Sequence, residues 1–90
     1  MFEREVLYPI LQTASGLNET MLEGRLAAVS HTLNVALQQP PAHAALILAL
    51  IQELQYDGLH MGHPYTDQLS DLIHEQALVI MLKEWRFNKF

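Results

Sequence analysis

The chain contains no cysteine, which excludes a scaffold held together by disulfides. It has five basic residues against ten acidic ones, and no Lys or Arg cluster of the kind that binds phosphate backbones. Direct nucleic-acid binding is therefore not expected. A long hydrophobic run is also missing: the longest, Ala44–Ile51, is far short of the roughly 20 residues that cross a bilayer. Glu3 and Glu5 break the pattern of a signal peptide, so we expect a cytoplasmic protein without a membrane partner.

The length of 90 residues predicts a single domain, residues 1–90, with a thin core. A chain of this size buries only about 60–65% of the surface that its unfolded form exposes. Two segments, Ala44–Ile51 and Ala77–Leu82, are nevertheless apolar on nearly every side of a helix. One thin domain does not easily cover both, so we expect the chain to form a homodimer through its second or fourth helix.

Helical spacing of apolar residues begins in the first segment, Phe2–Ala14. Pro9 lacks an amide donor, so this helix either starts near Tyr8 or bends at the proline. The second segment opens with "TMLE", where Thr20 and Glu23 form a possible capping box. Its apolar residues then step by four, three, four and three, the spacing of a coiled-coil-like seam. These residues are Leu22, Leu26, Val29, Leu33 and Ala36.

The third segment, "AHAALILALIQELQ", follows Pro41, which suits a first helical position. Because its front half is apolar all round, it is expected to be the central helix of the fold, buried on all sides. The fourth segment runs from the candidate N-cap Thr66 to about Arg86. Its expected inner face consists of Leu69, Leu72, Ile73 and Gln76. No segment alternates as a strand does, so the sequence predicts an all-α bundle of three main helices and a short N-terminal helix.

Two groups of residues are candidates for binding a partner protein. The first is the C-terminal "KEWRFNKF", with Trp85, Arg86, Phe87 and Phe90. Aromatic and Arg side chains dominate protein interfaces, although such residues also stack on bases, and Trp85 could equally close the core. The second group is the stripe of the second helix, Leu22, Leu26, Val29 and Leu33. Either group could contact a second copy of the chain or a different protein.

The stretch "DGLHMGHPY" is the strongest candidate for metal chemistry. His60 and His63 lie three residues apart, and His74 follows in the next helix. A structural zinc site needs four ligands at defined spacing, and the chain offers one loose histidine pair without cysteine. The alternative is a helix-terminating loop in which Gly58 caps the third helix and the histidines face solvent. We therefore expect no metal and no cofactor.

Catalytic motifs are also missing from the sequence. Ser30 and His31 are neighbours on a helix, so their side chains point to different faces and cannot form a nucleophile–base pair. The sequence contains no G-x-S-x-G, glycine-rich phosphate loop or H-E-x-x-H. No catalytic residue is assigned, and we do not expect an enzyme.

The helix order, the stripe of the second helix and the run "AALILALIQELQ" are similar to those of small helical regulators of enteric bacteria that act as two-component connectors. The likeness lies in leucine spacing alone, so no residue roles are carried over. From the residues themselves we expect a small acidic protein-binding module: an adaptor, a chaperone or a regulator. One alternative is an immunity-type inhibitor that blocks a basic partner. Another is a metal- or pH-sensing protein built on the histidine loop at residues 58–64.

Overall fold

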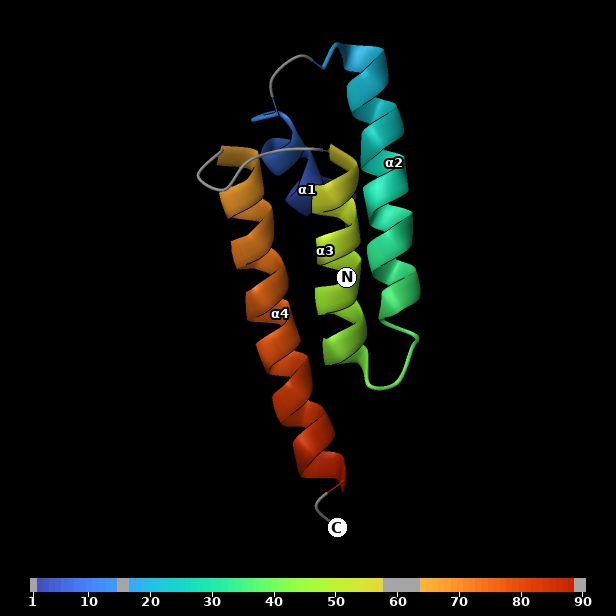
Figure 1. Cartoon of the computed structure of the whole chain (residues 1–90), viewed down its shortest axis with the longest axis vertical. Coiled ribbons are helices and arrows are strands. Elements are labelled where there is room, and N and C mark those ends of the chain that lie inside the picture. Colours follow the sequence, from blue (N-terminus) through green and yellow to red (C-terminus); the bar gives the residue numbers. More distant parts are fainter. Residues whose placement is uncertain (1, 15–16, 58–63, 89–90) are drawn as a thin grey trace.

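The computed structural model describes residues 2–14, 17–57 and 64–88, and every regular element in these ranges is an α-helix (Figure 1). In chain order the helices are α1 (Arg4–Leu11), α2 (Glu19–Ala36), α3 (Ala42–Asp57) and α4 (Pro64–Asn88). The predicted all-α architecture, with three long helices and a short first helix, is confirmed. None of the helices in the described ranges combines the length and the apolar composition that a bilayer-spanning helix requires.

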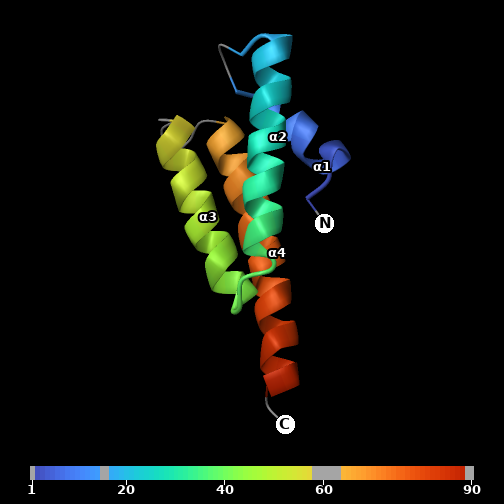
Figure 2. The same cartoon turned by 90° about the vertical axis from the view of Figure 1, so that its right-hand side faces the viewer.

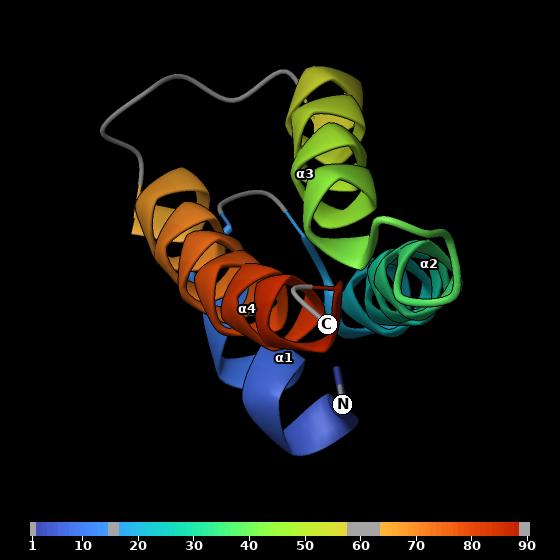
Figure 3. The same ribbon diagram turned by 90° about the horizontal axis from the view of Figure 1, so that it is seen from below.

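The helices form an elongated bundle with extents of 49 × 23 × 20 Å. α2, α3 and α4 run roughly along the long axis (Figures 1 and 2). α3 contacts both α2 and α4, and α1 contacts the same two helices. Seen along the axis, α1 and α3 therefore close the space between α2 and α4 from opposite sides (Figure 3). This arrangement leaves the outer sides of α3 and α4 without a neighbouring helix.

The predicted stripe of α2 forms one wall of the core. All five residues are buried, and Val29 and Leu33 are almost completely inaccessible to solvent. Their 3.5-residue spacing keeps the stripe on one side of the helix over about four turns. Across the interior it meets side chains from the N-terminal segment, from α3 and from α4. These are Phe2, Leu7, Leu11, Leu46, Ala49, Leu50, Tyr65, Leu69 and Ile73.

The N-terminal segment is fastened to α2 by its backbone as well as by its side chains. The Phe2 carbonyl accepts hydrogen bonds from Ser30 Oγ at 3.0 Å and from Asn34 Nδ2 at 3.4 Å. Ser30 thus has a structural role on the buried side of α2. α1 starts at Arg4 and contains Pro9, so of the two predicted alternatives the start near Tyr8 is wrong. α1 tolerates the proline because a helix of two turns loses only one internal amide donor.

Two details of the helices differ from the predictions. Asn18 caps α2 by accepting a hydrogen bond from the Met21 amide at 2.9 Å, so the capping box predicted for Thr20 and Glu23 is wrong. α4 begins at Pro64, which places Thr66 in its first turn instead of at the N-cap. Proline suits that first position because its missing amide proton would be unpaired there in any case.

α3 is not the fully buried central helix that its composition predicted. Leu46, Ala49 and Leu50 are buried between α2 and α4, but Leu48 and Ile51 on the opposite side are exposed. Only two long helices pack against α3, and the third side faces solvent. The predicted inner face of α4 is correct for Leu69 and Ile73, which are buried, and for Leu72 and Gln76, which are half-buried. The excess of apolar residues over the capacity of the core is therefore real, and it lies on the outside of the bundle.

Candidate functional site

The main candidate for a binding surface is the C-terminal half of α4. Five large apolar side chains are exposed within eight residues of this helix: Leu78 at 53%, Val79 at 41%, Met81 at 39%, Leu82 at 54% and Trp85 at 59%. Single exposed apolar residues are ordinary on a protein surface, but a contiguous group on one helix is typical of a contact region.

A shallow depression lies within this surface. Its volume is about 370 Å³, and it is lined by Val79, Leu82, Lys83, Trp85 and Arg86. The lining includes an indole and a guanidinium, two groups that are enriched at protein interfaces. The structure therefore places the predicted residues Trp85 and Arg86 together on an exposed surface. Phe87 belongs to α4 but its side chain lies outside the described part of the structure, as does Phe90.

The second predicted group lies in a different environment. Leu22, Leu26, Val29 and Leu33 have at most 7% of their surface exposed, because they form the core side of α2. A partner could reach them only if the bundle opened. The structure thus assigns this stripe to the chain's own core, and it is not part of the candidate surface.

Sequence reasoning took the apolar run that contains Leu78 and Leu82 as an argument for self-association, but it did not name either residue as part of a binding site. The signal was present in the spacing. Tyr65, Leu69, Ile73 and Ala77 follow one another at four-residue steps and form the buried side of α4. Leu78 and Leu82 lie on the opposite side of that helix.

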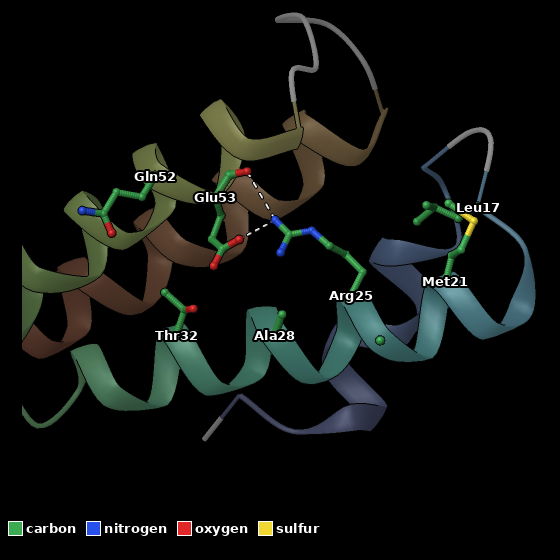
Figure 4. A pocket seen from close by; sticks show the side chains of 8 residues that line it. Leu17, Met21, Arg25, Ala28, Thr32, Gln52 and Glu53 are labelled. Atoms are coloured by element: carbon green, nitrogen blue, oxygen red, sulfur yellow. Dashed lines mark hydrogen bonds and ion pairs between the residues drawn. The ribbon is translucent and has the colours of Figure 1, made fainter.

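A second surface feature is the groove between α2 and α3, with a volume of about 790 Å³ (Figure 4). Its floor and edges are Leu17, Met21, Gly24, Arg25, Ala28, Thr32, Gln52 and Glu53. Gly24 and Ala28 lie one turn apart on α2. Neither has a side chain larger than a methyl group, so they leave this side of the groove unfilled. Apart from its chain neighbours and the backbone of its own helix, no atom lies within 4 Å of the position that a Cβ on Gly24 would occupy, so the groove is open there.

The groove is bridged by an ion pair between Arg25 of α2 and Glu53 of α3 (Figure 4). The Arg25 guanidinium donates to the Glu53 carboxylate and also, at 3.4 Å, to the Glu53 backbone carbonyl. The two side chains are only 12% and 9% exposed. A pair with so little water contact is costly to break, because removal of one partner leaves an uncompensated charge. We assign it the structural role of fixing α2 against α3.

Glu84 of α4 caps the N-terminus of α3. Its Oε1 accepts from the Ala42 amide at 2.7 Å, and its Oε2 lies 3.0 Å from His43 Nδ1. Partial burial opposes the charge of this carboxylate, but the hydrogen bonds from His43 and from the Ala42 amide outweigh that effect and lower the pKa of Glu84. The free amides at a helix N-terminus favour such a negative group. The carboxylate therefore ties the C-terminal part of α4 to α3.

A third ion pair joins α1 to α2 at the surface. The Arg4 guanidinium donates two hydrogen bonds of 2.5 Å to the Glu23 carboxylate and lies 4.8 Å from the centre of the Tyr8 ring. The hydrogen bond from Arg4 lowers the pKa of Glu23, and the same bond raises the pKa of Arg4. Both side chains are about half exposed, so solvent screens this pair.

The predicted histidine candidates are not assembled into a site by the described residues. His60 and His63 lie outside the described ranges. His74 is exposed, and its Nδ1 is 2.8 Å from the Ser70 carbonyl of its own helix. Within residues 2–14, 17–57 and 64–88, no group of three or more His, Asp or Glu side chains could hold a metal ion.

Comparison of the chain with protein-family models, with curated proteins and with solved structures finds no match. The functional argument therefore rests on the molecule itself. Its strongest features are the exposed apolar half of α4, with its cationic rim, and the open groove between α2 and α3.

Proposed function

We propose that this chain acts by binding other proteins, as an adaptor, a chaperone or a regulator, and that it does so as a homodimer in the cytoplasm. The observation that carries the proposal is the exposed apolar surface of α4 around Leu78, Leu82 and Trp85. Burial of apolar area contributes roughly 25 cal/mol per Å². A surface of this kind therefore favours association as soon as a complementary partner is present.

The composition of the surface supports a protein partner. Interfaces are enriched in Trp, Met and Arg, and their energetic centres contain the aromatic and Arg side chains. Trp85, Met81 and Arg86 bring these three residue types to one part of α4. Lys83 and Arg86 supply positive charge at the same place, which orients an acidic partner segment.

The two alternative functions receive less support. Among the described acidic residues, Glu23, Glu53 and Glu84 are each engaged within the chain by Arg4, Arg25 and His43. Their charge is therefore partly compensated, which weakens the case for an inhibitor that acts through negative charge. A metal- or pH-sensing function depends on His60 and His63, which lie outside the described residues.

Site-specific photocrosslinking in the native host tests the proposal. A photoreactive benzoylphenylalanine in place of Leu82 is expected to give protein adducts, either with another protein or with a second copy of the chain. The same group in place of Gln12, which is exposed at the C-terminal end of α1, is the matched control and should give none. If Leu82 gives no more adducts than Gln12, the surface is not a binding site and the proposal is wrong.

A further inference from the structure

The outer side of α4 carries a row of residues with the spacing of a coiled-coil seam. We name this row the outer seam; it consists of Asp71, Glu75, Leu78, Leu82 and Trp85. The steps of four, three, four and three place all five on one side of the helix. All five are exposed, and the buried row that ends at Ala77 lies on the opposite side. α4 therefore has one seam that faces the bundle and a second seam that faces solvent.

Charge along this second seam is divided between its two ends. Asp71 and Glu75 lie toward the N-terminal end of α4, while Lys83 and Arg86 lie toward its C-terminal end, with Leu78 and Leu82 between them. The four charged side chains are exposed, and none is part of an ion pair within the described residues. A helix with acidic residues at one end and basic residues at the other is complementary to an antiparallel copy of itself.

We propose that the outer seam binds the outer seam of a second copy of this chain, with the two α4 helices antiparallel. This inference rests on the proposed function and names the partner of the α4 surface. An antiparallel pair places Asp71 opposite Arg86 of the second copy, and Glu75 opposite Lys83. The midpoint of the first pair lies between Leu78 and Val79, and the midpoint of the second pair lies at Val79. One twofold axis at this position therefore forms both ion pairs twice, as an isologous dimer requires.

The side of α4 on which the charged residues lie also agrees with this twofold axis. A row of residues along one flank of the outer seam starts at Glu75. It continues at steps of four, four and three through Val79, Lys83 and Arg86. A twofold axis perpendicular to both helices lays this row against its own copy. The acidic end then reaches the depression between Lys83, Trp85 and Arg86 of the second copy. Leu78 packs against its own copy at the axis, and Leu82 lies one turn away, where it faces Glu75 of the second copy.

A parallel pair does not satisfy these charges. It would set Asp71 and Glu75 against the same carboxylates, and Lys83 and Arg86 against the same cations. Like charges directly opposed across a helix pair are unfavourable, and they suppress that orientation. The antiparallel arrangement thus follows from charge, while the apolar centre supplies the attraction.

Single cysteines test the orientation, because the wild-type chain has no thiol of its own. Leu78→Cys, close to the axis, is expected to form a disulfide-linked dimer with itself under mild oxidation. Asp71→Cys and Trp85→Cys should not dimerise alone but should crosslink to each other when the two variants are mixed. A disulfide needs Cα atoms about 4.4–6.8 Å apart, which facing positions of packed helices provide. Self-crosslinking of Asp71→Cys with failure of the mixture would show a parallel pair and overturn the proposal.

Charge reversal tests the partners of each residue. Asp71→Arg with Glu75→Lys is expected to raise the dimer dissociation constant by about tenfold or more, since four exposed ion pairs become repulsive contacts. Lys83→Glu with Arg86→Asp should have the same effect. A chain that carries all four substitutions should recover most of its self-association, because the ends are then exchanged and again complementary. Circular dichroism confirms that each variant is folded, and sedimentation equilibrium gives the dissociation constants.

The experiments separate this inference from the proposed function. If the purified chain stays monomeric at high concentration while Leu82 crosslinks to a different host protein, the α4 surface binds proteins but the self-pairing is wrong. If the chain dimerises but the four-residue exchange fails to restore association, the dimer uses another surface or register and the proposal is also wrong. If neither self-association nor crosslinking occurs, both conclusions fail together.

Discussion

At the scale of single residues, the structure holds its polar groups by contacts that the sequence did not reveal. Asn18 and Thr20 are both residue types that cap helices, and they are two positions apart. The choice of Asn18 depends on the extended backbone at that residue, which directs its side chain to the Met21 amide. Glu23 then pairs with Arg4, a residue 19 positions away. Spacing rules capture contacts within a helix, whereas these choices depend on how the chain enters the helix and what packs beside it.

Thr66 provides a direct test of the observed start of α4. Its hydroxyl is buried and has no hydrogen-bond partner within the described structure. An unpaired buried hydroxyl costs roughly 1–3 kcal/mol, so Thr66→Val, which has nearly the same shape, is expected to leave the free energy of unfolding unchanged or to raise it by about 1 kcal/mol. Urea denaturation measures this difference. If Thr66 were the N-cap predicted from the sequence, the same substitution would instead cost about 1 kcal/mol.

Glu84 gives the molecule an acid-sensitive contact between α3 and α4. Because its pKa is lowered from the ordinary value of 4.5, its charged form is favoured by folding. This contribution is fully present above the ordinary pKa and is lost as the pH falls through the lowered pKa of the folded state. Glu84→Gln is therefore expected to lower the melting temperature at neutral pH and to have little effect in acid, below the lowered pKa of Glu84.

The matched control for this substitution is Glu5→Gln, since that exposed carboxylate accepts no hydrogen bond within the described residues. Melting temperatures of the wild type and both variants are compared at the two pH values. A Glu84→Gln deficit of the same size in acid and at neutral pH would show that the carboxylate charge is not what stabilises this contact.

At the scale of the helices, the sequence predicted best where one side of a helix is buried and the spacing is regular. The stripe of α2 and the inner face of α4 were found from periodicity alone, because burial on one side imposes that pattern. The prediction for α3 was wrong because its apolar residues surround the helix and therefore do not indicate which side is buried. Leu48 and Ile51 face solvent only because no helix packs on that side, a fact set by the arrangement of α2 and α4. On α4 the apolar run Ala77–Leu82 hides the buried side in the same way, and only the four-residue steps from Tyr65 to Ala77 indicate it.

α2 also contains a glycine that the monomer does not require. Gly24 is exposed, lies inside the helix and has open space around its Cβ position. Gly24→Ala is expected to raise the free energy of unfolding by about 0.5–1 kcal/mol, since alanine is the better helix former and less flexible when unfolded. The control is Ala28→Gly, one turn along the same edge of the groove, which should lower it by a similar amount. A loss of stability in Gly24→Ala, measured by urea denaturation, would mean that another chain packs closely against this side of α2.

At the scale of the whole molecule, the distribution of apolar surface distinguishes this chain from a self-contained bundle. The core is complete on the inner sides of four helices, and Phe2 and Tyr65 seal it at 1% exposure. The remaining apolar residues on α3 and α4 do not stabilise the monomer, because they stay in contact with water. Of these two surfaces, only that of α4 also carries opposite charges at its two ends. We therefore expect association through α4 to be more stabilising and more selective than association through α3.

The single tryptophan of the chain reports on this association without any label. Trp85 lies at the end of the outer seam and is 59% exposed in the monomer. In an antiparallel dimer its indole is covered by the part of the second α4 around Asp71, and indole emission moves to shorter wavelength as water is removed from the ring. We expect the emission of the wild-type chain to shift to shorter wavelength as the protein concentration rises. Leu78→Glu, which places a charge at the axis, should keep the long-wavelength emission at every concentration.

This measurement also decides whether Trp85 belongs to the core. Truncation of a buried Trp costs about 3–5 kcal/mol, which would unfold so small a domain. A side chain that is mostly exposed has little to lose, so Trp85→Ala should shift the free energy of unfolding of the dilute monomer by no more than about 0.5 kcal/mol. Self-association should weaken in the same variant, as seen by sedimentation. Emission at short wavelength even in dilute solution, together with early melting of Trp85→Ala, would place the indole inside the monomer and remove it from the outer seam.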